Sequence, residues 1–215
     1  MISDLLFLDF SLTNPEQIIK IGGLALLLFI IFAETGLFFG FFLPGDSLLF
    51  IAGIFCEDIL KMNVWVLIVL LIVCAIAGTC VGYFFGKLAE NYLRNKKENF
   101  FYKKKYLEMA QDFYARHGMM AFVMGRFLPI VRTFVPILAG MVKIEFGKFL
   151  FFNIVGAAIW IIVMVMAGFL LGRTFPTITD HLELIVVGMV LLSAIPVVVS
   201  WFRHRRQIAK NDQKI

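Results

Sequence analysis

The chain has 215 residues, of which 61% are hydrophobic and 16% are charged. Together with a mean hydropathy of +0.91, this composition excludes an ordinary soluble domain and predicts an integral membrane protein. The net charge of +5 does not indicate a nucleic-acid-binding protein, because most Lys and Arg residues lie in two segments, 87–118 and 203–215. Basic segments beside membrane helices mark the cytoplasmic side, so both are predicted to be cytoplasmic.

Four segments are apolar enough to be considered as membrane spans. A spanning helix needs about 20 predominantly apolar residues. The candidates, in chain order, are residues 18–34, 64–86, 149–172 and 184–202. The sequence therefore predicts an all-α integral membrane protein with about four transmembrane helices in a single membrane domain.

Residues 36–55 are apolar, but they contain Pro44, Gly45 and Asp46, which a spanning helix normally avoids. Proline removes a helical hydrogen bond and breaks the helix. Because the basic loop is predicted to be cytoplasmic, the span before it runs inward from an external start. Residues 36–55 are then predicted to form a re-entrant helical hairpin that opens outward, provided that residues 18–34 span the membrane.

Residues 119–142 are predicted to form a second re-entrant hairpin. They follow the cytoplasmic loop directly, and the span after them must run outward if the C-terminal tail is cytoplasmic. The segment thus begins and ends on the same side. Its Pro129 and Pro136 interrupt helical hydrogen bonding, and Arg126 and Arg132 are unfavourable in contact with lipid. Broken backbone at this depth requires surrounding protein or a water-filled cavity.

A short internal repeat relates the two halves of the chain. Ala52-Gly53 recurs as Ala139-Gly140, and the pattern from Gly82 to Lys87 recurs from Gly168 to Arg173, at nearly the same spacing. The two hairpins would open to opposite sides, so the repeat is predicted to be inverted. Inverted repeats with broken helices meeting near the midplane are typical of transporters.

Four ionisable residues stand out from the apolar background: Glu34, Asp46, Arg126 and Arg132. Charges inside a membrane are rare and usually mark a substrate pathway or a proton relay. The alternative is a set of internal salt bridges that only stabilises the fold.

The two arginines favour recognition of a phosphate monoester or diester. Arginine stays protonated and presents a planar fork of donors that matches phosphate oxygens. We therefore interpret Arg126 and Arg132 as phosphate-binding residues. Glu34 and Asp46 suit proton coupling instead, because the charge of a carboxylate removed from water depends on its surroundings. For Asp46, capping of the half-helix that follows Pro44-Gly45 is an alternative role.

No set of residues indicates an enzyme. The three histidines, His117, His181 and His204, lie in separate segments, no cysteine pair has zinc spacing, and no nucleophile or phosphate-loop motif is present. We expect no catalytic residues, no metal site and no cofactor. Asn153 and Trp160 are further candidates to line a cavity, although packing explains them equally well.

Two motifs carry a resemblance to a known family. Glu34 precedes Phe-Leu-Pro44-Gly45-Asp46, and residues 125–140 read Gly-Arg-Phe-Leu-Pro-x-x-Arg-Thr-Phe-x-Pro-x-x-Ala-Gly. Over residues 18–202 the sequence resembles the DedA family of bacterial inner-membrane proteins, part of the wider group called SNARE-associated or VTT-domain proteins. The family's functional acids fall on Glu34 and Asp46, and its functional arginines on Arg126 and Arg132.

The resemblance implies a multi-pass protein of the bacterial cytoplasmic (inner) membrane that moves lipids between leaflets. Bacterial members are associated with the return of undecaprenyl phosphate to the cytoplasmic face, dependent on the proton-motive force, and related eukaryotic proteins are phospholipid scramblases. The resemblance therefore implies a flippase-type transporter of polyprenyl phosphate that acts in the bilayer with protons as partners. The alternatives are a broad phospholipid scramblase and a non-transport assembly factor for envelope proteins.

Overall fold

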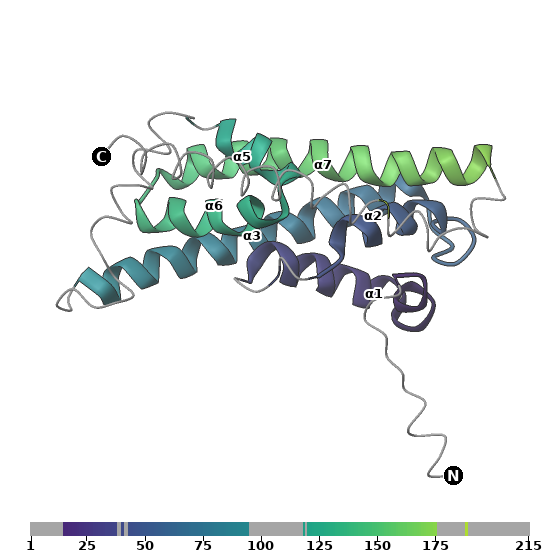
Figure 1. Ribbon diagram of the computed structural model, residues 1–215, viewed down its shortest axis with the longest axis horizontal. Coiled ribbons are helices and arrows are strands. Elements are labelled where there is room, and N and C mark those ends of the chain that lie inside the picture. The colour runs from purple at the N-terminus through teal and green to yellow at the C-terminus, as the bar shows by residue number, and fades with distance from the viewer. Residues whose placement is uncertain are drawn as a thin grey trace, which may run out of the picture. The chain divides into compact units, whose positions relative to one another are not determined.

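The computed structural model describes residues 15–37, 40, 43–94, 118, 120–175 and 188 (Figure 1). The predicted span at 184–202, the tail at 203–215, most of the basic loop and the three histidines lie outside the described residues. The helices reported below belong to one compact unit, Met1–Pro176.

Every regular element in the described part of the chain is helical, which confirms the predicted all-α class. The elements are α1 (Pro15–Gly36), α2 (Gly45–Ile54), α3 (Val64–Arg94), α5 (Met120–Met124), the 3₁₀ turn η2 (Gly125–Phe127), α6 (Pro129–Met141) and α7 (Phe146–Thr174).

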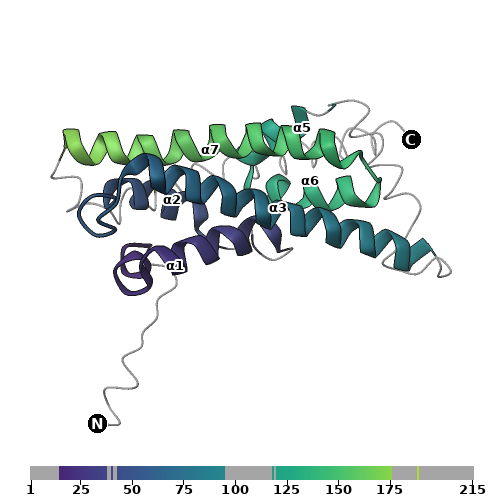
Figure 2. The same cartoon turned by 180° about the vertical axis from the view of Figure 1, so that it is seen from behind.

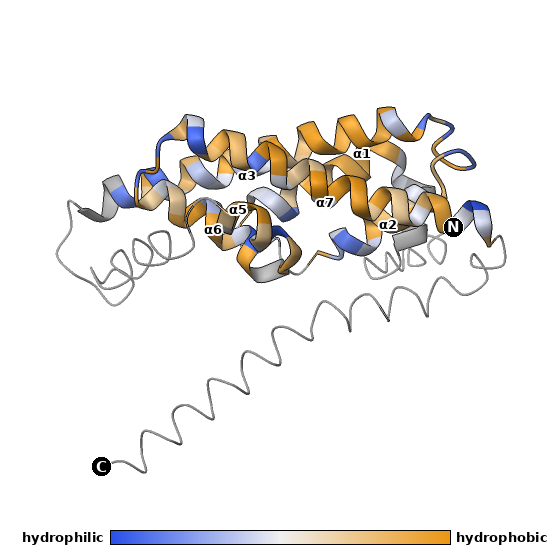
Figure 3. Cartoon of the chain, turned by 90° about the horizontal axis from the view of Figure 1, so that it is seen from above, coloured by the Kyte–Doolittle hydropathy of each residue, from blue (hydrophilic) through white to orange (hydrophobic). Residues whose placement is uncertain are grey.

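Two of these helices, α3 and α7, are long and apolar enough to cross a membrane, over Val64–Glu90 and Phe146–Thr174. They correspond to the predicted spans at 64–86 and 149–172. Large apolar side chains such as Trp65 and Val163 are exposed on their outer faces, and hydrophobic residues dominate the middle of the bundle (Figure 3). An apolar exterior of this kind suits contact with lipid.

The helices α3 and α7 lie beside each other in opposite directions (Figures 1 and 2). Tyr83, in the second half of α3, stacks on Phe149, near the start of α7, with ring centroids 4.6 Å apart. Its hydroxyl donates a hydrogen bond to the carbonyl oxygen of Ile144 at 2.6 Å. The antiparallel pair is the frame on which the shorter helices pack.

The helix α1 differs from the prediction for residues 18–34. It runs along α3 in the same direction: the Cys74 thiol donates to the carbonyl oxygen of Leu28 at 3.0 Å, and Gly36 contacts the backbone of Gly78, near the middle of α3. Its apolar part is Gly22–Gly36. The helix α1 ends at Gly36 and α2 begins at Gly45, so the two helices flank the break at Pro44-Gly45.

The second hairpin consists of α5 and η2, then a break at Leu128, then α6. Leu128 has extended backbone angles, and Pro129 occupies the first turn of α6, where a missing N–H costs no hydrogen bond. The helix α6 continues through Pro136 to Met141, so the break predicted at Pro136 does not occur. In the first hairpin, α2 begins at Gly45 directly after Pro44, as predicted.

The outgoing arm of each hairpin packs on the long helix of the other half. The arm α2 lies along α7, and α6 lies along α3 (Figures 1 and 2). At the first crossing, a Cβ added to Gly53 would stand 2.2 Å from the carbonyl oxygen of Val165, and one added to Gly168 would stand 2.0 Å from that of Phe50. Gly53 therefore faces the carbonyl group three residues before Gly168, and Gly168 faces the carbonyl group three residues before Gly53.

The second crossing repeats this geometry. A Cβ on Gly140 would lie 2.0 Å from the carbonyl oxygen of Tyr83, and one on Gly86 would lie 2.0 Å from that of Ile137. Gly53 and Gly140 correspond to each other in the sequence repeat. Gly86 and Gly168 play the same part in the two crossings, although the counterpart of Gly168 in the sequence repeat is Gly82, one helical turn before Gly86. Both crossings need direct backbone contact, which glycine allows. The matched crossings support the predicted inverted repeat.

Replacing these glycines should destabilise the fold. Gly86→Ala and Gly53→Ala are each expected to lower the free energy of unfolding by about 1–3 kcal/mol, because the added methyl group must displace a carbonyl group of the facing helix. Gly147→Ala is the matched control, since a Cβ at this helical glycine has no heavy atom within 4 Å. Thermal unfolding in detergent measures the difference, and equal stability of all three variants would contradict the close crossings.

Candidate functional site

The candidate site lies where the broken ends of both hairpins meet, beside the middle of α3 and α7. Glu34 comes from the last turn of α1, Asp46 from the first turn of α2 and Arg132 from the first turn of α6, while Arg126 lies in η2. The two breaks bring together residues that are far apart in the sequence. All four predicted site residues lie in this region.

Arg132 is the centre of a buried ion cluster. Its guanidinium donates hydrogen bonds to Oε1 of Glu34 and, at 2.9 Å, to Oδ1 of Asp46. The carbon of the guanidinium lies 4.4 Å from the centroid of the Trp160 ring, and the indole N–H donates to the same Asp46 oxygen at 2.9 Å. Trp160 therefore contacts both partners of the ion pair: its ring face packs against the Arg132 guanidinium, and its N–H group bonds to Asp46.

The exposure of the two acids differs. The side chain of Glu34 is 1% exposed and that of Asp46 is 26% exposed. Burial of an unpaired carboxylate costs several kcal/mol, on the order of the desolvation penalty of an ion, so Glu34 depends on Arg132 more than Asp46 does. Asp46 makes no capping hydrogen bond to α2, and its carboxylate accepts from Arg132 and Trp160 instead. The helix-capping alternative is thus not observed.

Gly45 makes the approach of Glu34 possible. A Cβ at this position would overlap Oε2 of Glu34, at 1.3 Å. The Pro44-Gly45 break therefore does more than end a helix, because its glycine leaves the space that the carboxylate occupies.

Arg126 has a different environment. It is 4% exposed, and it donates hydrogen bonds to Oγ1 of Thr79 at 3.0 Å and to Oδ1 of Asn153. No described carboxylate forms an ion pair with it. Of the two predicted phosphate-binding arginines, Arg132 is thus neutralised by acids and Arg126 is held by neutral groups.

Both arginines line one small cavity of about 10 Å³, which is close to the space of a single water molecule. The full lining consists of Thr79, Phe122, Gly125, Arg126, Arg132, Val135, Pro136 and Asn153. The cavity joins the surroundings of Arg126 to Arg132. Glu34 and Asp46 do not line it and are connected to it through their hydrogen bonds with Arg132.

Sequence reasoning left Thr79 out of the site and left Asn153 and Trp160 undecided. Thr79 is a lone hydroxyl residue between Gly78 and Gly82 in an otherwise apolar helix, and this isolation is the signal that would have identified it. Asn153 and Trp160 are both buried, and their hydrogen bonds to Arg126 and Asp46 place them in the site.

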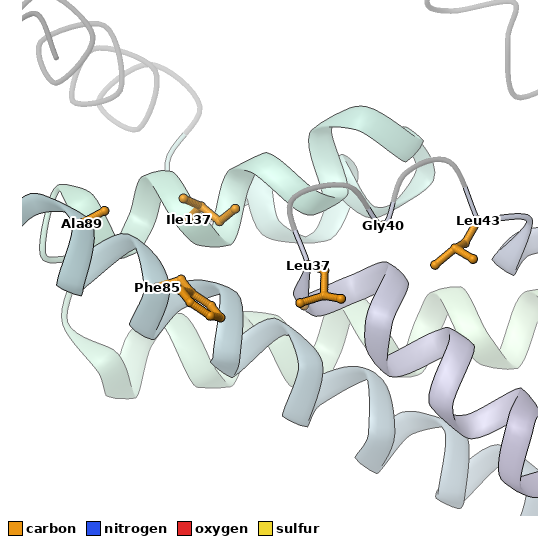
Figure 4. A pocket seen from close by; sticks show the side chains of 7 residues that line it. Leu37, Gly40, Leu43, Phe85, Ala89 and Ile137 are labelled. Atoms are coloured by element: carbon orange, nitrogen blue, oxygen red, sulfur yellow. The ribbon is translucent and has the colours of Figure 1, made fainter. Parts of the chain in front are cut away.

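A larger cavity with apolar walls, about 530 Å³, is shown in Figure 4. Its lining consists of Gly36, Leu37, Gly40, Leu43, Phe85, Ala89 and Ile137. Two consecutive residues of α6 line the two spaces: Pro136 lines the polar cavity and Ile137 lines the apolar one. A charged site and a hydrocarbon-lined space therefore adjoin each other.

Comparison with known proteins agrees with this architecture. The VTT domain model matches residues 43–170. The chain is 36% identical to the protein DedA of Escherichia coli over 98% of its own length and 96% of that protein, and 34% identical to the inner membrane protein YqjA of the same organism over 76% and 73%. A membrane protein of Mycobacterium leprae is 34% identical over 90% and 86%. No solved structure gives a significant match.

The fold and the buried charges define a helical integral membrane protein with broken helices at its centre. The chain belongs to the VTT-domain (DedA) family. The predicted family and the predicted location in the inner membrane are both confirmed.

The ion cluster should show strong coupling between its members. Arg132→Met is expected to lower the free energy of unfolding by about 3–5 kcal/mol, because it leaves the buried Glu34 carboxylate without a partner. Adding Glu34→Gln removes the unpaired charge, so the double variant should regain a substantial part of that loss. Denaturant unfolding of wild type, both single variants and the double variant measures the coupling, and simple additivity of the two single losses would contradict the ion pair.

Proposed function

We propose that the protein is a transporter that moves undecaprenyl phosphate, or a similar polyprenyl phosphate, across the cytoplasmic membrane for recycling of the carrier lipid, coupled to protons. The observation that supports this most strongly is the meeting of two buried arginines with two acids at the ends of both hairpins. A buried guanidinium is suited to a phosphate group, and no covalent step is needed.

The two adjoining cavities match the two parts of such a lipid. The polar cavity offers guanidinium donors for the phosphate, and the apolar one offers carbon walls beside it. The phosphate would move through the protein while its chain stays in a hydrocarbon environment. This division keeps the charged group out of contact with the bilayer core, where its cost is highest.

Proton coupling follows from competition for Arg132. In the described structure Glu34 and Asp46 occupy its donors. Protonation of the two carboxyl groups removes the negative charges that hold Arg132, so its guanidinium becomes available to phosphate. When the protons leave, the ion pairs form again and compete with the bound phosphate. Binding is thus favoured on the more acidic side and release on the less acidic side, which moves the lipid inward under a proton-motive force.

The hairpins provide the geometry for alternating access. Each one reaches the site from its own direction, and their outgoing arms, α2 and α6, run along antiparallel helices. Rocking of one repeat against the other would open the site to either side in turn. The inverted crossings support this mode over a fixed open channel.

Transport into proteoliposomes tests the proposal. Arg126→Ala and Arg132→Ala should each reduce the transport of polyprenyl phosphate about tenfold or more, since a hydrogen bond to a charged group contributes about 1.5–3 kcal/mol. Lys148→Ala is the control, because Lys148 is an exposed cation paired with Glu145 on the surface. An acidic outer compartment should accelerate inward transport in wild type.

The same vesicles separate the alternatives. Equal transport of labelled phosphatidylcholine, without any effect of the pH gradient, would indicate a broad scramblase instead. Wild-type rates in both arginine variants would refute the assignment of the site.

A further inference from the structure

We propose that Asn153 and Thr79 complete an anion site around Arg126, and that the Asn153 amide makes this site selective for phosphate monoesters over diesters. The inference rests on the proposed function and deepens it by assigning the terminal phosphate to Arg126. Arg132 is the second ligand, and its own ion pairs open as the phosphate enters.

The first observation is the unequal neutralisation of the two arginines. Arg132 has two acidic partners, whereas the acceptors of Arg126 are the hydroxyl of Thr79 and the amide oxygen of Asn153. Both acceptors are neutral, so the positive charge of Arg126 is oriented but not cancelled. A cation buried without a counter-charge is costly, and an anion that binds beside it recovers that cost.

The second observation is a set of buried donors without acceptors. Nη1 of Arg126, Nδ2 of Asn153 and Nε of Arg132 are buried and have no hydrogen-bond partner among the described residues. All three residues line the polar cavity. Buried polar groups are almost always paired, so three unpaired donors around one cavity indicate a ligand that supplies acceptors.

The orientation of Asn153 follows from the chemistry of its neighbour. Arginine has donors only, so the Asn153 atom that faces Arg126 must be the oxygen, and the NH₂ group is left as a donor. Thr79 is fixed in the same way: its hydroxyl donates to the carbonyl oxygen of Ala75 at 2.6 Å and accepts from Arg126. The two neutral residues therefore use their acceptor atoms to hold Arg126, and Asn153 adds a donor to the site.

Three donors fit the end of a phosphate monoester. A monoester presents three terminal oxygens and up to two negative charges, whereas a diester presents two such oxygens, one charge and a second bulky substituent. In the described structure the cavity holds only about 10 Å³, too little for a phosphate group, so binding requires that the wall formed by Arg132 move. Recognition at Arg126 is thereby linked to the opening of the ion cluster.

The decisive variant is Asn153→Asp, which keeps the shape of the side chain and places a carboxylate against Arg126. An internal ion pair would then neutralise Arg126 and remove the amide donor. We expect the affinity for geranyl phosphate, a short monoester, to fall at least tenfold, measured by thermal stabilisation of the purified full chain in detergent. The variant itself should be as thermostable as wild type or more so. An unchanged affinity would overturn the inference, because it would show that neither the amide donor of Asn153 nor the uncancelled charge of Arg126 contributes to binding.

Thr79 supplies a second test that does not depend on Asn153. Thr79→Val removes the hydroxyl acceptor at constant shape and should weaken binding of geranyl phosphate several-fold, whereas Thr79→Ser keeps the hydroxyl and should bind as wild type does. In wild type, the methyl diester of geranyl phosphate should bind at least tenfold more weakly than the monoester.

The outcomes separate this inference from the proposed function. Tight binding of the monoester by both Asn153→Asp and Thr79→Val, or equal binding of monoester and diester by wild type, would overturn the inference even where polyprenyl phosphate is transported. Selective binding of the monoester, lost in Asn153→Asp, would support it even if the vesicles showed no transport, and the proposed function alone would then fail.

Discussion

The buried ion pair between Arg132 and the two acids is the interaction on which the other features depend. A guanidinium buried in a membrane protein is stabilised by counter-charges from the protein itself, because the hydrocarbon of the bilayer offers none. Here the cation comes from the second hairpin and both anions come from the first. The pairing of these charges thus fixes the position at which the two helix breaks meet. It also joins the two halves of the chain there, beside the middle of α3 and α7.

Close backbone contact is the mechanical counterpart of that requirement. The outgoing arms reach the centre of the bundle only because glycines at both crossings let helices touch along their backbones. The same constraint operates at the site itself, where Gly45 leaves room for the Glu34 carboxylate. Glu34 therefore reaches Arg132 through two effects together: the glycines let the helices come close, and the opposite charges attract each other.

The sequence was sufficient to predict the long helices, the two interruptions and the four charged residues, because charge, proline and length are strong signals in an apolar chain. It did not give the direction of α1, which its contacts with α3 show. It was misleading for Pro136, which α6 accommodates without a break. Thr79 was missed because a threonine in an apolar helix satisfies itself by bonding to the preceding turn, so its second partner, Arg126, becomes visible only in three dimensions.

The exchange of arms between the halves has a consequence for biogenesis. During synthesis, α2 and its acidic residue emerge from the ribosome well before α7 and Arg132 exist, so the first hairpin enters the membrane without its packing surface or its counter-charge. The first hairpin therefore lacks its counter-charge until α6 has been made, and it lacks its packing surface until α7 has been made.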